Sequence, residues 1–295
     1  MDETDEKQNS QDYYDQEAEE YSRQYQEGYE QYPANQIRLN FIIEILKKNH
    51  FKTILDAGCG TCGPMIKLLN DDFYVKGFDF SKEMVKEGKS ELKKAGYDTE
   101  LIYHADLEAG TGLRDEKFDA LLALGVFPHI TDEKIALHNI GTLLNPQGSA
   151  YIEFRNDLFS AYTLNEYSLD FFLNRIIDLN SLPQEVRDEV INFYSERLKF
   201  DKPVKKDNGK IAYTDILAKF HNPLSIGREL FEPCGFSVVD IHFYHYHALP
   251  PIFENKHQKL FRELSLKMER PNDWKGYFMA SAYVIEAKKN ESSVF

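Results

Sequence analysis

The sequence is poor in cysteine and tryptophan and has no long apolar run. Its 295 residues include three cysteines, Cys59, Cys62 and Cys234, and one tryptophan. An odd and small number of cysteines provides no disulfide framework. No apolar run approaches the roughly 18 residues that span a bilayer, and Met1-Asp2-Glu3 is unlike the start of a signal peptide. We therefore expect a cytoplasmic protein without disulfides or a membrane partner.

Positive charge is also scarce. The chain has 35 Lys and Arg against 49 Asp and Glu, for a net charge of -14 at pH 7. Residues 1–20 contain nine acidic residues and one lysine and so contribute -8, which leaves -6 for the rest. A nucleic-acid-binding surface needs clustered Lys and Arg, so we expect no nucleic-acid partner. The acidic residues 1–12 are predicted to form a disordered tail.

Segments typical of strands alternate with segments typical of helices along most of the chain. Strand-like runs begin near residues 54, 73, 101, 118, 149, 236 and 277, with helical patterns at 13–49, 64–69, 81–94, 134–144, 225–233 and 255–270. This order predicts an α/β fold with a doubly wound, mostly parallel seven-stranded sheet. Residues 156–222 break the alternation and are aromatic and helical in pattern, which predicts an inserted lid. Residues 13–155 and 223–295 then form the two parts of the core.

A glycine-rich segment follows the first strand. Asp56 ends that strand, and Gly58, Gly60 and Gly63 fit the G-x-G-x-x-G pattern of nucleotide-binding loops. The pattern alone also suits an NAD-dependent dehydrogenase. However, a carboxylate at position 56 would repel a pyrophosphate and favour a cationic ligand. Cys59 and Cys62 form a C-x-x-C pair in this loop, for which redox chemistry is the alternative to simple packing in a tight turn.

Two more acids, Asp79 and Asp106, come at or just after the ends of the next two strands. With Asp56 and the glycine loop, they make residues 37–155 resemble the class I S-adenosylmethionine-dependent methyltransferases, which have a Rossmann-like fold. The departure is Cys62, which stands where the family usually has its third glycine. The resemblance implies S-adenosylmethionine as cofactor and assigns roles as follows. Asp56, Gly58, Cys59 and Gly60 would hold the methionine part, Asp79 the ribose hydroxyls, Phe80, Asp106 and Leu107 the adenine, and the Leu124 carbonyl would lie near the ammonium group.

Residues near the ends of the fourth and fifth strands are candidates for binding the methyl acceptor. His129 follows the fourth strand and is our candidate general base, with a structural histidine in a turn as the alternative. Arg155 and Asn156 follow the fifth strand, where an arginine suits a carboxylate or phosphate group or, alternatively, an ion pair that steadies the lid. Arg155 is also a candidate catalytic residue. Tyr162 and Asn165 are expected to line the same pocket.

A histidine-rich segment, residues 242–247, lies in the sixth strand. Strand alternation predicts that residues 242, 244 and 246 face one side and that His245 and His247 share the other. We expect His245 and His247 to form a wall of the acceptor pocket, with His245 also a candidate catalytic residue. A metal pair is an alternative, but the sequence fixes no third ligand, so we predict no metal site.

These patterns predict a small-molecule methyltransferase that acts on oxygen or nitrogen. An aromatic lid and an acidic surface favour an enclosed pocket, and Arg155 favours a sugar or a phosphate-bearing metabolite as acceptor. The alternatives are a protein or peptide methyltransferase and a catalytically silent cofactor-binding module. An NAD-dependent oxidoreductase is the least favoured.

Overall fold

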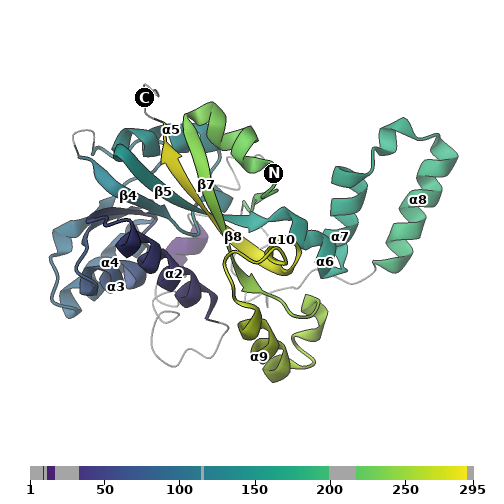
Figure 1. Ribbon diagram of the computed structural model, residues 1–295, viewed down its shortest axis with the longest axis horizontal. Helices are drawn as coiled ribbons and strands as arrows, with labels where there is room; N and C mark the ends of the chain where they lie inside the picture. Colours follow the sequence, from purple (N-terminus) through teal and green to yellow (C-terminus); the bar gives the residue numbers. More distant parts are fainter. Residues whose placement is uncertain (1–8, 10–11, 17–32, 114–115, 199–216, 291–295) are drawn as a thin grey trace.

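The computed structural model describes residues 9, 12–16, 33–113, 116–198 and 217–290. In these ranges a twisted sheet lies between two layers of helices (Figure 1). The tail predicted at residues 1–12 lies outside the described residues except for Asn9 and Asp12, and so do residues 17–32 of the helical pattern predicted at 13–49. None of the described helices is both long and apolar enough to cross a membrane.

The sheet confirms the predicted doubly wound architecture. Its strand order is β3-β2-β1-β4-β5-β8-β7, and a short eighth strand, β6, pairs with β5 outside this path. The pairs from β3 to β5 are parallel, whereas β8 is antiparallel to both β5 and β7. The strands are β1 (Thr53–Ala57), β2 (Tyr74–Asp79), β3 (Ile102–His104), β4 (Phe118–Ala123), β5 (Leu144–Asn156), β6 (Phe220–His221), β7 (Phe236–Tyr246) and β8 (Ala280–Lys289).

Local sequence signals explain several helix boundaries. Ser81 and Asp132 cap α4 and α5 by accepting hydrogen bonds from backbone N–H groups of the first turn, and Pro64 opens α3. The last predicted strand begins three residues later than expected, because residues 276–279 form a helical turn. The helices are α2 (Ala34–Lys48), α3 (Gly63–Asn70), α4 (Lys82–Lys94), α5 (Glu133–Leu143), α6 (Ser160–Thr163), α7 (Glu166–Phe171), α8 (Gln184–Arg197), α9 (Gln258–Met268) and α10 (Gly276–Met279).

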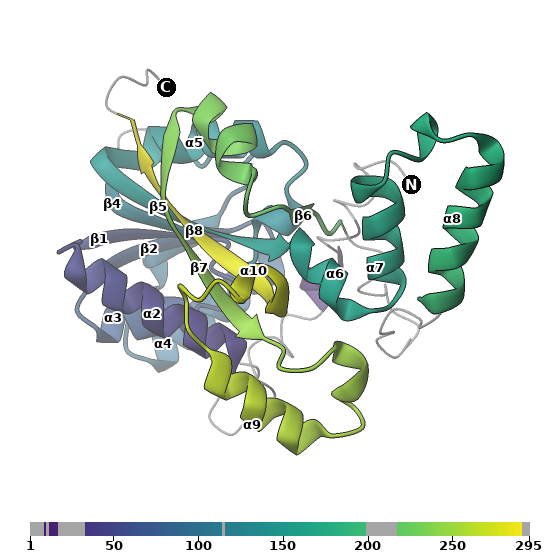
Figure 2. The same cartoon turned by 45° about the vertical axis from the view of Figure 1, so that its right-hand side comes forward.

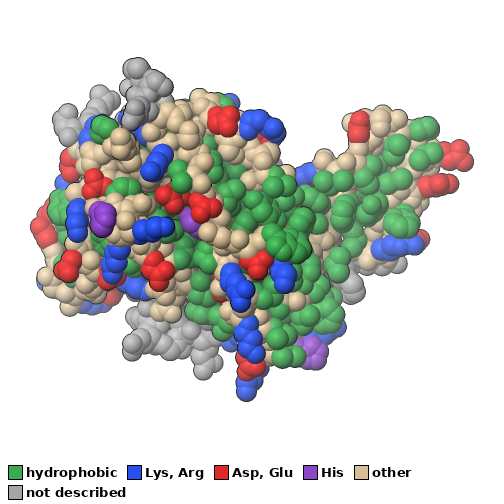
Figure 3. Space-filling view, in the orientation of Figure 1, with side chains coloured by type: hydrophobic (Ala, Val, Ile, Leu, Met, Phe, Trp, Pro, Cys, Tyr) green, Lys and Arg blue, Asp and Glu red, His purple; other side chains and the backbone are tan. Residues whose placement is uncertain are grey.

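The described part of the predicted lid is helical. It consists of α6, α7 and α8 with short helical turns between them, and residues 199–216 lie outside the described residues. Helix α6 packs against α10, whereas α7 and α8 project from the body of the molecule (Figures 1 and 2). No residue of α8 is buried, and hydrophobic side chains are exposed along this projection (Figure 3), among them Ile176, Val186 and Phe193.

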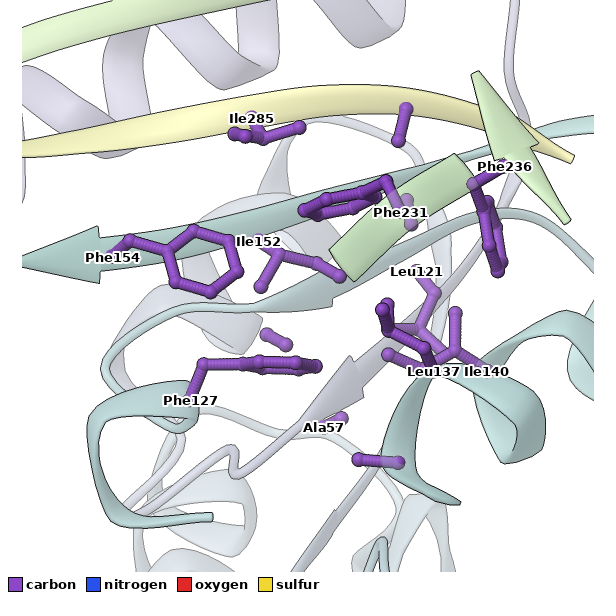
Figure 4. Close-up of a cluster of buried hydrophobic side chains, with 14 of the residues drawn as sticks. Ala57, Leu121, Phe127, Leu137, Ile140, Ile152, Phe154, Phe231, Phe236 and Ile285 are labelled. Atoms are coloured by element: carbon purple, nitrogen blue, oxygen red, sulfur yellow. The ribbon is translucent and has the colours of Figure 1, made fainter. Parts of the chain in front are cut away.

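The two faces of the sheet bury separate hydrophobic clusters. One cluster joins the sheet to α5 and to the helical turns at residues 227–234, and includes Phe127, Phe154 and Phe231 (Figure 4). The other joins the sheet to α2, α3 and α4. Because both faces are covered, the central strands are buried on both sides, as parallel sheets require. Polar side chains in these strands are therefore exceptions that need a reason.

Candidate functional site

A pocket opens at the edge of the sheet where β1, β2, β3 and β4 end. Ligands of doubly wound folds bind outside the carboxyl ends of the strands, so this is the expected place. Tyr14 and His129 contribute to its wall. The loops at the strand ends contribute Gly58, Gly60, Asp79, Phe80, Ala105, Asp106, Leu107, Glu108, Leu124, Gly125 and Val126. The structure thus brings together seven of the nine predicted cofactor residues, and the other two, Asp56 and Cys59, line a smaller adjoining cavity.

The glycine loop needs glycine at specific positions. Gly58 has φ +75°, and a Cβ atom there would lie 2.3 Å from Cγ2 of Val126. The backbone N–H groups of Gly58 and Cys59 both donate to the carbonyl of Phe78. Cys62 has φ +68° and begins α3 in the left-handed conformation that glycine usually supplies. The family's third loop glycine is therefore replaced by a cysteine that adopts a glycine-like backbone conformation.

Asp79 ties the glycine loop to the end of β2. Its Oδ2 accepts a hydrogen bond from the backbone N–H of Gly60 at 2.9 Å, and its Oδ1 accepts one from Ser81 at 2.9 Å. Burial raises the pKa of Asp79 to about 6, although these two hydrogen bonds oppose the shift. Each carboxylate oxygen can accept a further bond, so the side chain can still receive two ribose hydroxyls.

The predicted adenine end of the pocket is flanked by rings and an acid. The rings of Phe80 and Tyr14 meet edge to face, with centroids 6.2 Å apart. Asp106 lines the pocket, and its Oδ1 accepts a hydrogen bond from the backbone N–H of Glu108 at 2.8 Å. The Leu107 carbonyl accepts a bond from the Asn139 amide at 2.7 Å. That interaction fixes the loop that carries both residues.

Asp56 lies in the smaller cavity together with Arg38. This cavity shares Gly58, Gly60 and Leu124 with the larger pocket, so the two adjoin at the glycine loop. Asp56 is buried, and its Oδ2 has no hydrogen-bond partner among the described residues. Burial raises the pKa of Asp56 to about 7, while the charge of Arg38 opposes this shift. A buried oxygen without a partner is costly unless a ligand supplies a donor.

Arg38 takes part in a buried cluster that sequence reasoning missed. Its guanidinium forms an ion pair with Glu153 of β5, and its Nη1 donates to the hydroxyl of Tyr244 at 3.4 Å. Burial, followed by the charge of Glu153, raises the pKa of Tyr244 well above its usual value. The available signal in the sequence was Glu153, a single acid within an apolar strand. Its partner Arg38 lies 115 positions away, so the sequence did not reveal the pair.

His129 connects two segments that border the pocket. Its Nδ1 lies 2.5 Å from the carbonyl oxygen of Leu217, which can only accept, so Nδ1 carries the proton. Nε2 of the neutral ring therefore accepts from the hydroxyl of Tyr14, at 2.9 Å. Burial, followed by the nearby charge of Arg155, lowers the pKa of His129 to about 4. The ring is neutral at pH 7, and Tyr14 occupies the nitrogen that a general base would use.

The predicted acceptor residues do not line the described pocket. Arg155 lies over the ring of Phe220, 5.7 Å from its centroid, and is near enough to His129 to affect its pKa. The buried Asn156 amide donates toward the carbonyls of Gly276, Tyr277 and Ala280. Tyr162 and Asn165 also make hydrogen bonds within the protein. Tyr162 donates to the Ala248 carbonyl, and Asn165 caps α7.

Strand β7 does not keep the predicted alternation through its histidines. His245 has φ +59°, and beyond it the strand changes sides. Tyr244 packs in the cluster next to α2, whereas Tyr246 joins Phe243 in the opposite cluster, so the prediction that residues 244 and 246 share a face was wrong. The rings of His245 and His247 are nevertheless adjacent, with centroids 5.0 Å apart.

The histidine pair lies in an apolar environment. His247 packs against Phe159 and Phe261, and its Nδ1 is buried without a hydrogen-bond partner among the described residues. Burial lowers the pKa of His245 to about 4 and that of His247 to about 3. Both rings are therefore neutral at pH 7. Within the described ranges, no three His, Cys, Asp or Glu side chains are grouped so as to hold a metal ion.

The two loop cysteines are buried free thiols. Their Sγ atoms lie 3.9 Å and 4.0 Å from the carbonyl oxygen of Gly60. A hydrogen bond with Cys62, followed by burial, raises the pKa of Cys59 well above its usual value. The thiolate is the reactive form, so this environment favours packing over redox chemistry.

Comparison with known proteins places this site in a family. Residues 54–148 match the model of the methyltransferase domain. Rat glycine N-methyltransferase is 30% identical over 135 residues, which cover 39% of this chain and 44% of that protein. A ubiquinone biosynthesis O-methyltransferase from Vibrio campbellii is 25% identical, over 43% of this chain and 54% of its own length. The chain thus spans about half the length of these relatives.

Solved structures extend the likeness to most of the chain. Magnesium protoporphyrin IX methyltransferase from Synechocystis, with bound SAH, has a TM-score of 0.51 at 14% identity, covering 92% of this chain and 93% of that one. An S-adenosylmethionine-dependent methyltransferase from Clostridium acetobutylicum has a TM-score of 0.50 at 12% identity, covering 88% and 92%. At these identities the likeness concerns the fold.

Residues 54–148 are a methyltransferase domain, and the fold around them is that of the class I S-adenosylmethionine-dependent methyltransferases. The resemblance that the sequence indicated is therefore confirmed for this domain and for the fold. The roles of individual residues stay predictions.

Proposed function

We propose that this protein transfers a methyl group from S-adenosylmethionine to an oxygen or nitrogen atom of a small molecule. The observation that carries the proposal is the convergence of Asp56, Asp79 and Asp106 with the glycine loop on two adjoining cavities at one edge of the sheet. A phosphate-binding loop would not combine three acids in this way. The match of residues 54–148 to the methyltransferase domain supports the same conclusion.

The smaller cavity fits the amino-acid end of the cofactor. Asp56 presents a buried oxygen without a partner, which suits an ammonium group, and Arg38 in the same cavity suits a carboxylate. Asp79 and Asp106 in the larger pocket would then hold the ribose hydroxyls and the adenine amine. A zwitterion at one end and a nucleoside at the other match the two adjoining cavities.

The bound cofactor supplies a sulfonium methyl group that a nucleophile displaces directly. The protein's tasks are then to position the two reactants and to exclude water. Tyr14 lies on the wall of the cofactor pocket, where the neutral ring of His129 holds its hydroxyl. We propose that His129 acts mainly by keeping Tyr14 in place, because base catalysis would require the hydroxyl to leave Nε2.

For the acceptor, we propose a sugar or another metabolite that carries a phosphate or carboxylate group. Arg155 supports this choice. It lies near the carboxyl end of β5, which runs parallel to β4, and its charge lowers the pKa of His129 on the wall of the cofactor pocket. The relatives named glycine N-methyltransferase and ubiquinone biosynthesis O-methyltransferase support a small acceptor in general. We further propose that the segment predicted as a lid, residues 156–222, covers the acceptor.

Binding and turnover experiments test the proposal in sequence. Isothermal titration with S-adenosylmethionine, its demethylated product and NAD should show binding of the first two only. Formation of the demethylated product should then be measured across a panel of small acceptors with and without phosphate groups. Absence of binding would overturn the proposal, whereas binding without turnover on any acceptor, peptides included, would favour a silent cofactor-binding module.

A further inference from the structure

Glu153 is an unusual residue for its position in the fold. It lies within β5, which is covered on both faces, and its neighbours Ile152 and Phe154 are fully buried. Glu153 itself is only 9% exposed. Strands of a sheet with two covered faces are normally apolar, and burying a carboxylate costs free energy. Its presence therefore calls for an explanation beyond packing.

Glu153 forms a cluster with two other side chains. The carboxylate pairs with the guanidinium of Arg38, which is 4% exposed, and the hydroxyl of Tyr244 on β7 is within hydrogen-bonding reach of both. A buried ion pair adds little net stability compared with apolar side chains of the same volume. Stability alone therefore does not account for the cluster.

The cluster also touches both cavities of the cofactor site. Arg38 lines the smaller cavity beside Asp56. Oε2 of Glu153 lies 4.0 Å from the position that a Cβ atom on Gly125 would occupy, and Gly125 lines the larger pocket. Glu153 is thus placed where its negative charge can set the orientation of a cation in the site without lining either cavity.

We propose that Glu153 is a positioning residue, which fixes the guanidinium of Arg38 so that it can bind the carboxylate at the amino-acid end of the methyl donor. This inference rests on the proposed function. A guanidinium is planar and has five donors, so an anion on one edge determines where the other edge points. Without Glu153, Arg38 could pair with Asp56, with which it already interacts electrostatically, and that pairing would remove the carboxylate meant for the donor's ammonium group.

A comparison of two ligands tests this role. S-adenosylhomocysteine contains the amino-acid end, whereas 5′-methylthioadenosine has the same nucleoside and sulfur but lacks it. With Glu153→Gln, we expect the affinity for S-adenosylhomocysteine to fall about tenfold, because a charge-assisted contact is misplaced. The affinity for 5′-methylthioadenosine should stay the same. Isothermal titration gives both constants, and their ratio would not change if Glu153 only stabilised the fold.

Glu286→Gln is the matched control. Glu286 is also a buried glutamate, 7% exposed, on the adjacent strand β8, but its partners are His242 and Tyr151 and it lines neither cavity. This variant should leave the affinity ratio unchanged. Tyr244→Phe removes only one hydroxyl from the cluster and should give a smaller loss of S-adenosylhomocysteine affinity, which provides a second test if Glu153→Gln does not fold.

Two results would overturn the inference. The cluster is only structural if Glu153→Gln and Tyr244→Phe both bind S-adenosylhomocysteine normally. The same holds if each variant loses affinity for S-adenosylhomocysteine and 5′-methylthioadenosine by the same factor. If the unmodified protein binds no S-adenosylhomocysteine at all, the proposed function fails, and the inference fails with it.

Discussion

The hydroxyl of Tyr14 lies 2.9 Å from Nε2 of His129, which joins two residues 115 positions apart on the wall of the cofactor pocket. The other nitrogen of His129 is bonded to the Leu217 carbonyl, so one ring connects the N-terminal helical segment to the chain that returns from the projecting helices. A residue of the pocket wall, His129, therefore holds both of these segments in place.

This relationship predicts that Tyr14 and His129 act as a unit. Tyr14→Phe and His129→Gln should each weaken the binding of S-adenosylhomocysteine by about two- to tenfold, and the double variant should be no worse than the poorer single variant, because both remove the same hydrogen bond. Titration calorimetry on the three variants measures this. His138→Gln, on an exposed part of α5, is the control. Turnover that falls in His129→Gln with binding unchanged would instead support His129 as the base.

Among the predicted site residues, Asp79 should be the one whose loss most weakens cofactor binding. Asp79→Asn keeps the size of the side chain but removes the charge and one acceptor oxygen, which also disturbs its bonds to Gly60 and Ser81. We expect cofactor affinity to fall by about ten- to a hundredfold. Asp98→Asn is a suitable control, because Asp98 also accepts a backbone N–H but lies away from both cavities. Equal affinities for the two variants would remove Asp79 from the site.

The stability of the free protein should fall as pH rises from about 5 to about 8. Burial raises the pKa of Asp56 to about 7 and that of Asp79 to about 6. Each raised pKa favours the protonated folded state, so its stabilising effect is complete below about pH 4 and is lost as pH rises through 6 to 7. The free protein should therefore melt at lower temperature near pH 8 than near pH 5, all else equal.

A ligand with an ammonium group should reverse this trend, because it prefers the ionised carboxylates. The shift in melting temperature caused by S-adenosylmethionine should therefore increase between about pH 5 and pH 8. Asp56→Asn should flatten the dependence on pH. An unchanged profile in Asp56→Asn would mean that Asp56 does not face the ligand.

Asn156 is expected to affect stability more than substrate binding. Asn156→Ala leaves the carbonyls of Gly276, Tyr277 and Ala280 without their donor, which should lower the free energy of unfolding by about 2 kcal/mol. Urea denaturation measures the loss, with the exposed Asn174→Ala as control. A normal unfolding free energy combined with a higher KM for the acceptor would restore Asn156 to the acceptor site.

The sequence was informative where the signal is local. Alternating apolar runs and caps such as Ser81 and Asp132 depend on residues within one turn or one strand, so the strand order in the chain, most helices and the three strand-end acids were predicted from them. The glycine loop was predicted for the same reason, because the spacing of Gly58, Gly60 and Gly63 is a short motif within one turn.

Prediction was less successful where a residue's role depends on partners that are distant in sequence. The amide of Asn156 meets carbonyls more than 100 residues away, and Tyr14 meets His129 through a contact of similar separation. Likewise, the positive φ of His245 changes the face of β7, and no pattern of alternation contains that information. Hydrogen-bonding capacity is visible in a sequence, but the groups that use it are not.

The sequence by itself therefore determined the α/β class and the place of the glycine loop, and it indicated the methyltransferase domain, because these depend on periodicity and on short motifs. Only the tertiary structure decided that Arg38 stands beside Asp56 and is paired with Glu153, and that Tyr14 occupies Nε2 of His129. The physical reason is that a buried charge is tolerated only with its partner, and packing of distant elements selects that partner.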